Sequence, residues 1–216
     1  MKSRIAIPLT FAVVAFTVTI TALVGIDAEN GAAVASEKPA PVAVNEEKKS
    51  GDGFSPFVDK DGNISRPTDY KQKWAHLGSW AVAKKKDSSV IEMHDVYTPH
   101  ETIVAFNKTG EFPDGTVLVK EVHKSKNARL TTGHAAWSSD MKVWFVMIKD
   151  KKGRFKDNDH WGEGWGWALF EAKDPTKNVS VDYESSCISC HTPVEESDWV
   201  YRYGYPDLKG PEKKWN

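Results

Sequence analysis

Runs of apolar residues divide the middle of the chain into short strands separated by polar turns. Segments 79–82 and 90–97 carry β-branched and aromatic residues, a composition typical of strands. Segments 116–123 and 143–148 are apolar at successive positions, which predicts central strands buried on both faces. A further strand is predicted over 165–172.

One helix is predicted between the second and third strands. Thr98 and Glu101 match a capping box, with Pro99 at the first helical position. Gly110 is placed to end this helix, and a turn over 113–115 follows it. Strands outnumber helices, so we expect an α+β fold: mainly an antiparallel β-sheet with a few flanking helices.

The N-terminal third has a different pattern. Lys2 and Arg4 precede an apolar run over 5–26, which predicts an export signal, and Ala33-Val34-Ala35 offers a cleavage site. The run is also long enough for an uncleaved membrane anchor. Residues 27–53 lack aromatic residues, as a tether does. We expect a signal peptide or anchor over 1–35, a flexible linker over 36–65 and one domain over 66–216, in the periplasm.

Composition narrows the function classes. Twenty-nine Lys and Arg oppose 30 Asp and Glu, a net charge of −1, whereas nucleic-acid binders usually carry a basic excess. Nine Trp, nine Phe and six Tyr are enough to build a core. Only two cysteines are present, which excludes a disulfide-rich scaffold.

Both cysteines lie in Cys187-Ile188-Ser189-Cys190-His191, which matches the C-x-x-C-H attachment motif of c-type haem. On a helical turn the two thiols share one side and can form thioethers with the two vinyl groups of one porphyrin. His191 can then ligate the iron. A thiol redox site would need a βαβ context, a zinc site would need further ligands, and a structural disulfide would close a very short loop. We therefore expect one covalently bound haem c, attached in a short helical segment.

Lys120 is the second chemical candidate. On a strand it shares a face with Leu118 and Val122. A lysine on an apolar face is costly unless it is neutral, paired or covalently bonded. Spacing alone favours an edge strand from which the amine reaches water.

No residue is singled out as a second iron ligand. An electron-transfer haem usually has Met or His on its far side. An open, five-coordinate iron is therefore a hypothesis. The candidates for a second ligand are Met93, Met141, Met147, His76, His94, His100, His123, His134 and His160.

Two further features have ordinary explanations that we favour. Trp165 and Trp167 fall on one face of a strand, which favours packing over an electron relay. Lys84, Lys85 and Lys86 form a charge run, which favours a solvated turn over a docking site for an acidic redox partner.

The string Gly-x-Phe-x-Asp-Gly-Thr-Val-x-Val-Lys-Glu over 110–121, the segment 147–150 and the late C-x-x-C-H motif together resemble the cytochrome P-460 family, which includes the beta-type cytochromes c prime. The resemblance covers about residues 68–208. It implies a mainly antiparallel sheet with flanking helices, usually in a homodimer. It also implies haem c with His191 as proximal ligand and an open distal position.

The resemblance also suggests roles for Lys120 and Phe145. In P-460 members a lysine is covalently bonded to the porphyrin, and by motif match this is Lys120. Hydroxylamine-oxidising members carry a distal glutamate five positions before the Asp of a Lys-Asp pair. Counting back from Asp150 gives Phe145, which cannot act as a base. Other carboxylates that could supply a base are Glu163, Asp150 and Asp157.

Two functions follow from the resemblance. The first is an exported mono-haem c oxidoreductase that oxidises hydroxylamine and passes electrons to a partner cytochrome, with Lys120 and Phe145 as catalytic-site residues. The second is a non-catalytic cytochrome that binds nitric oxide or a similar diatomic ligand under the apolar Phe145 cap. An electron-transfer cytochrome with a sixth protein ligand is a third hypothesis.

Overall fold

The computed structural model describes residues 54–211. The expected signal segment over 1–35 and most of the expected linker lie outside the described residues. Within the described part, no helix is long and apolar enough to cross a membrane.

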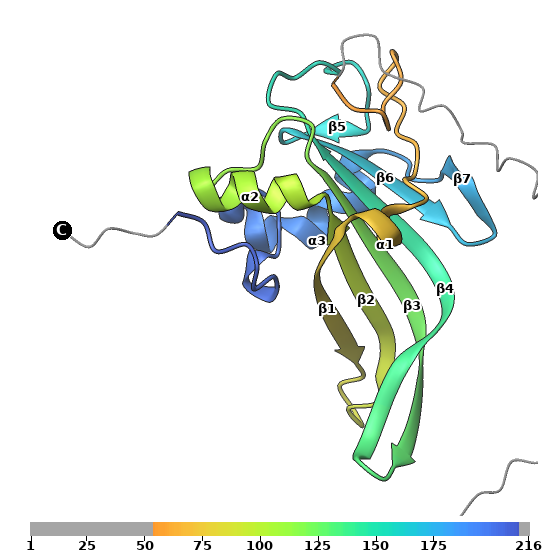
Figure 1. The fold of residues 1–216 in the computed structure, drawn as a ribbon. Helices are drawn as coiled ribbons and strands as arrows, with labels where there is room; N and C mark the ends of the chain where they lie inside the picture. Colours follow the sequence, from red (N-terminus) through yellow and green to blue (C-terminus); the bar gives the residue numbers. More distant parts are fainter. Residues whose placement is uncertain (1–53, 212–216) are drawn as a thin grey trace, which may run out of the picture. The chain divides into compact units, whose positions relative to one another are not determined.

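A seven-stranded antiparallel sheet dominates the described part (Figure 1). Its strand order is β1-β2-β3-β4-β6-β5, and β7 pairs with β6 beside this path. Every pairing between these strands is antiparallel, so the expected α+β fold is confirmed. The strands are β1 Ala75–Ala83, β2 Val90–Thr98, β3 Val117–Leu130, β4 Gly133–Lys149, β5 Trp161–Gly162, β6 Trp165–Glu171 and β7 Asp174–Asn178.

Strands β3 and β4 are longer than their apolar segments predict. They form one continuous hairpin, with register from Val117 opposite Ile148 to Leu130 opposite Gly133. The end of this hairpin extends beyond the neighbouring strands (Figure 1). Its residues are mostly polar and exposed, so backbone pairing holds them and no apolar pattern marks them in the sequence.

Helix α2, His100–Thr109, lies close to its predicted position and ends at Gly110, whose φ is +81°. The predicted capping by Thr98 is wrong, because Pro99 is the N-cap and no side chain caps the helix. The Thr98 hydroxyl instead donates to the Val117 carbonyl at 2.8 Å and ties the end of β2 to the start of β3. The other helical segments are short: α1 Tyr70–Lys73, a π-helical turn Glu184–Ile188, α3 Ser189–His191 and two 3-10 turns, Thr192–Ser197 and Arg202–Gly204.

Directly opposed residues on neighbouring strands point to the same side of the sheet and so define its two faces. Other parts of the chain cover both faces. The face that carries Leu118 and Met147 packs against α2 and the C-terminal helical segment. The opposite face, which carries Val119 and Val146, packs against residues 54–74. Figure 1 shows α1 in front of the sheet and α3 behind it.

The end of the expected linker is part of this packing. Val58 and Ile64 are buried, and they face each other across an isolated antiparallel bridge. Phe54 and Phe57 pack against the same cluster. Residues 54–65 are therefore folded onto the sheet, since their apolar side chains cover its second face.

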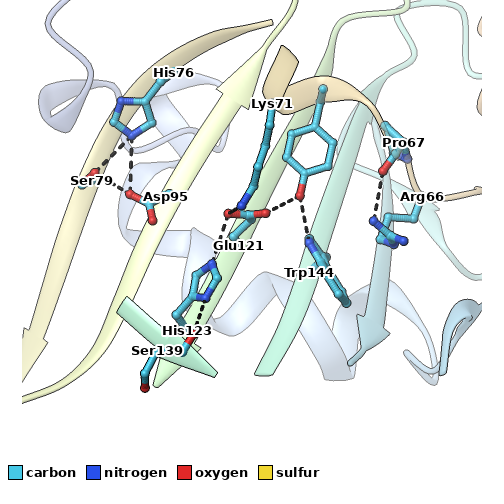
Figure 2. A network of polar contacts seen from close by, with 11 residues as sticks. Arg66, Pro67, Lys71, His76, Ser79, Asp95, Glu121, His123, Ser139 and Trp144 are labelled. Atoms are coloured by element: carbon cyan, nitrogen blue, oxygen red, sulfur yellow. Dashed lines mark hydrogen bonds and ion pairs between the residues drawn. The ribbon is translucent and has the colours of Figure 1, made fainter. Parts of the chain in front are cut away.

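A polar network crosses the second face (Figure 2). Glu121 is 1% exposed and accepts hydrogen bonds from the Tyr70 hydroxyl and from His123, whose Nε2 lies 3.2 Å away. Lys71 forms an ion pair with the same carboxylate at 2.9 Å, and Trp144 Nε1 donates to the Tyr70 hydroxyl at 2.9 Å. The buried charge of Glu121 thus links α1 to the centre of the sheet.

Candidate functional site

The C-x-x-C-H residues lie on a continuous right-handed helical segment. The π-helical turn Glu184–Ile188 leads directly into α3, and Ile188 and Ser189 at their junction are both helical. Asp182 supports the start, because its carboxylate accepts from the Ser185 amide at 2.6 Å. This segment matches the short helix that we expected around the cysteines.

Cys187 and Cys190 are both free thiols, and the sulfurs are not joined in a disulfide. Cys187 is buried and Cys190 is exposed. Burial raises the pKa of the Cys187 thiol to about 11, although nearby Lys120 acts in the opposite direction. The Cys187 thiol is therefore protonated at neutral pH.

All five candidate residues line one cavity between the sheet and this helical segment. Its empty volume, which includes space open to solvent, is about 750 Å³. Strands β3, β4 and β6 contribute Lys120, Phe145, Met147 and Trp167 to the lining. The C-terminal segment contributes Cys187, Cys190, His191 and Tyr201.

His191 is held in one orientation. Its Nδ1 donates to the Trp199 carbonyl at 2.6 Å, so Nε2 is the nitrogen that remains available to a metal. The imidazole also packs edge-on against Trp167, with the ring centroids 4.9 Å apart. Burial lowers the pKa of His191, which favours the neutral imidazole that ligates metals.

Lys120 lies on the central strand β3, between β2 and β4. The edge-strand interpretation is therefore wrong, because the neighbouring strands cover both sides of β3. Burial lowers the pKa of Lys120, and among the described residues no ion pair involves its amine. A lysine amine with a lowered pKa is more often neutral, which is the nucleophilic form.

Phe145 is the direct cross-strand partner of Lys120. The Lys120 Nζ lies 4.3 Å from the centroid of the Phe145 ring. None of the three proposed bases, Glu163, Asp150 and Asp157, lines the cavity. Asp150 instead pairs with Arg154 at 2.6 Å.

Of the nine candidate second ligands, only Met147 lines the cavity. It is buried in the same apolar cluster as Leu118 and Trp167, as expected for a core residue. His94 and His123 have carboxylate partners, Glu92 and Glu121, each at 3.2 Å.

Trp167 and Tyr201 were not predicted as site residues. Both are buried or half-buried, and both rings contact His191, with the Tyr201 centroid 5.7 Å from the imidazole centroid. The packing interpretation of Trp165 and Trp167 agrees with their complete or nearly complete burial, but Trp167 also forms part of the cavity wall. The one signal for Tyr201 was the alternation Tyr201, Tyr203, Tyr205 after the haem motif.

No curated protein matched the sequence. A family model, described as Cytochrome P460, matches residues 67–202. The matched range includes the sheet, Lys120, Phe145 and the C-x-x-C-H segment. The chain therefore belongs to the cytochrome P460 family.

Proposed function

We propose that this protein is a mono-haem c cytochrome whose open iron position binds nitric oxide or a similar uncharged diatomic ligand. Membership of a cytochrome family implies haem. The covalent attachment, the single haem and the ligand are parts of the proposal. They rest on the cavity and on the residues that line it.

The residues around the cavity fit a haem. Cys187 and Cys190 are unpaired thiols, three positions apart, on the wall opposite the sheet. Each thiol would add across one vinyl group, with a new sulfur–carbon bond and the thiol hydrogen moving to the other vinyl carbon. His191 would ligate the iron through Nε2, because Nδ1 is engaged with Trp199. The wall on the sheet side is mostly apolar, as a porphyrin requires.

When bound, haem supplies an iron that changes between ferric and ferrous states and offers a coordination position to a small ligand. Phe145 and Met147, both on β4, give the cavity wall an apolar surface that disfavours water and charged ligands. Lys120 also lines the cavity, and its amine could form a bond to the porphyrin. Replacing one N–H and one C–H by an N–C bond removes two hydrogens, so the cross-link also requires an oxidant such as hydrogen peroxide.

One observation favours nitric oxide over hydroxylamine as the ligand. Among the described residues, no aspartate or glutamate lines the cavity. Hydroxylamine loses protons as it is oxidised, and a base within hydrogen-bond reach accelerates such a reaction. Nitric oxide has no proton to lose, so an apolar Phe145 cap is sufficient for binding it.

Hydroxylamine oxidation is the second candidate. Lys120 favours it, because its position in the family string is that of the cross-linking lysine of P-460 members. In this case electrons would pass to a partner cytochrome. The protein would then be an oxidoreductase that uses a base other than a cavity carboxylate.

Export and assembly complete the proposal. Lys2, Arg4 and the apolar run over 5–26 support export to the periplasm, with or without a membrane anchor. Haem c attachment requires such export. The family resemblance supports a homodimer.

Two assays on one preparation test the proposed function. The chain would be produced with the haem c maturation machinery, titrated with nitric oxide and then assayed for hydroxylamine consumption with an acceptor dye. We expect one nitric oxide per haem and no multiple turnover of hydroxylamine. Repeated turnover would replace the first candidate by the second. A low-spin, six-coordinate resting spectrum would contradict the open position in both.

A further inference from the structure

The turn after the haem motif has an uncommon backbone. Asp198 and Trp199 are consecutive residues with φ of +59° and +62°. Residues other than glycine disfavour this left-handed conformation, and two in succession occur only where the surroundings enforce it. This backbone conformation allows one specific contact: the turn presents the Trp199 carbonyl to His191 Nδ1 at 2.6 Å.

A cross-strand pair from the sheet holds the turn. Lys149, at the end of β4, is opposite Trp165 on β6. The Lys149 side chain is 10% exposed, and its Nζ donates to Asp198 Oδ1 at 2.6 Å. Trp165 Nε1 donates to the Asp198 backbone carbonyl at 3.1 Å. The Asp198 side chain and backbone are therefore both fixed from the sheet.

The surrounding backbone leaves room for this contact. A Cβ on Gly164 would lie 3.1 Å from Lys149 Nζ, and Gly164 itself has a φ of +74°. The turn also donates its own amides, from Asp198 to the Glu195 carbonyl at 3.0 Å and from Trp199 to the Val194 carbonyl at 3.0 Å. The ion pair between Lys149 and Asp198 is thus an integral part of the turn and not an incidental surface contact.

We propose that Lys149 and Trp165 are positioning residues that act through Asp198 to hold the Trp199 carbonyl on His191 and thereby tune its donor strength toward the haem iron. The proposal rests on the proposed ligation of haem by His191. A hydrogen bond from Nδ1 to a carbonyl fixes the tautomer and makes the other ring nitrogen a stronger donor. A stronger donor favours ferric over ferrous iron, so this contact lowers the reduction potential.

Lys149→Met separates this role from a simple charge effect. Removal of a positive charge near haem would, by electrostatics alone, lower the reduction potential. Loosening of the Trp199 carbonyl would weaken His191 as a donor and raise it. We expect a higher potential and a lower iron–histidine stretching frequency in the resonance Raman spectrum of the ferrous protein. Lys149→Arg, which retains the donor to Asp198, should restore both values toward those of the wild type.

A matched control breaks a similar pair on the other side of the sheet. Lys71→Met removes one of the three partners of buried Glu121, and it should lower the melting temperature without changing the potential or the Raman frequency. If Lys149→Met does not fold, Asp198→Asn tests the same contact, since asparagine tolerates the left-handed conformation and only the charge is lost. It should lower the Raman frequency.

The proposal is overturned if Lys149→Met and Asp198→Asn change stability but leave the Raman frequency unchanged. It is also overturned if the potential of Lys149→Met falls. Failure of the proposed function has a different signature. In that case His191→Ala would leave the wild-type spectrum unchanged, and the iron–histidine band would be missing from the wild type itself.

Discussion

Lys120 and Phe145 oppose each other directly on β3 and β4, with the Lys120 Nζ 4.3 Å from the centroid of the Phe145 ring. Lys120 brings an amine to the cavity wall, and Phe145 brings an apolar ring beside it. The residue proposed to bond to the porphyrin and the position proposed to lack a base are therefore adjacent.

Lys120→Leu should leave haem attached through the cysteines but remove the bond to the porphyrin. The absorption spectrum should then become that of an ordinary c haem, because leucine has no nucleophilic nitrogen. Lys126→Leu, on the exposed part of the same strand, is the control and should leave the spectrum unchanged. An ordinary c-haem spectrum in the wild type would show that Lys120 makes no such bond.

Phe145→Glu should place a carboxylate opposite Lys120, inside the cavity. If the site lacks only a base, hydroxylamine oxidation should rise by roughly 10²-fold, the lower end for general base catalysis. Phe145→Gln has nearly the same size without the base and should show no gain. An equal gain in both variants would mean that polarity or space, and not proton transfer, limits the reaction.

His191→Ala should remove the proximal ligand while the two thioethers keep the haem in place. The spectrum and the reduction potential should both change, since an axial nitrogen is lost. His134→Ala, an exposed histidine on the β3–β4 hairpin, is the control. An unchanged spectrum in His191→Ala would exclude this residue as the iron ligand.

Met147→Leu tests whether the iron is open. Met147 is the one candidate second ligand that lines the cavity, and leucine conserves its volume closely. With an open iron, the spin state and the rate of nitric oxide binding should stay as in the wild type. A change from low-spin to high-spin iron would instead identify Met147 as a sixth ligand and support the electron-transfer hypothesis.

The strands that build the site could be predicted because they are apolar on both faces. Segment 143–148 falls within β4, and segment 116–123 falls within β3 except for its first residue, Thr116. The pairing of Lys120 with Phe145 could not be predicted, because the register depends on the hairpin turn over 131–132, between Leu130 and Gly133. That turn ends a polar extension that has no apolar alternation in the sequence.

The contacts that orient His191 could not be predicted from the sequence either. Left-handed backbone is usually announced by glycine, whereas here Asp198 and Trp199 adopt it. Lys149 lies far from both residues in the chain, and only the fold brings its amine to Asp198. The C-x-x-C-H motif predicts His191 as the iron ligand, but it does not predict which residues orient the imidazole.

The surroundings of Glu121 predict that the free energy of unfolding depends on pH. Burial alone would raise its pKa, but hydrogen bonds from Tyr70, Lys71 and His123 outweigh burial and lower the pKa below 4.5. Because the folded-state pKa is depressed, this stabilisation is complete above the unfolded-state value. It is lost as the pH falls through the folded-state value.

Glu121→Gln should therefore lower the free energy of unfolding at neutral pH by about 1–3 kcal/mol, the cost of leaving buried donors without a charged acceptor. The difference from the wild type should shrink in acid. Urea denaturation across this pH range measures both effects. A difference that stays constant down to the most acidic stable pH would show that the charge of Glu121 does not carry the effect.

The mass of the haem peptide tests the central claim, that the cavity holds haem bonded to Cys187 and Cys190. The mature holoprotein would be alkylated, digested and weighed. We predict that the 187–191 segment carries the mass of one haem and that neither cysteine is alkylated. Two alkylated cysteines, with haem released by acidic acetone, would contradict the account.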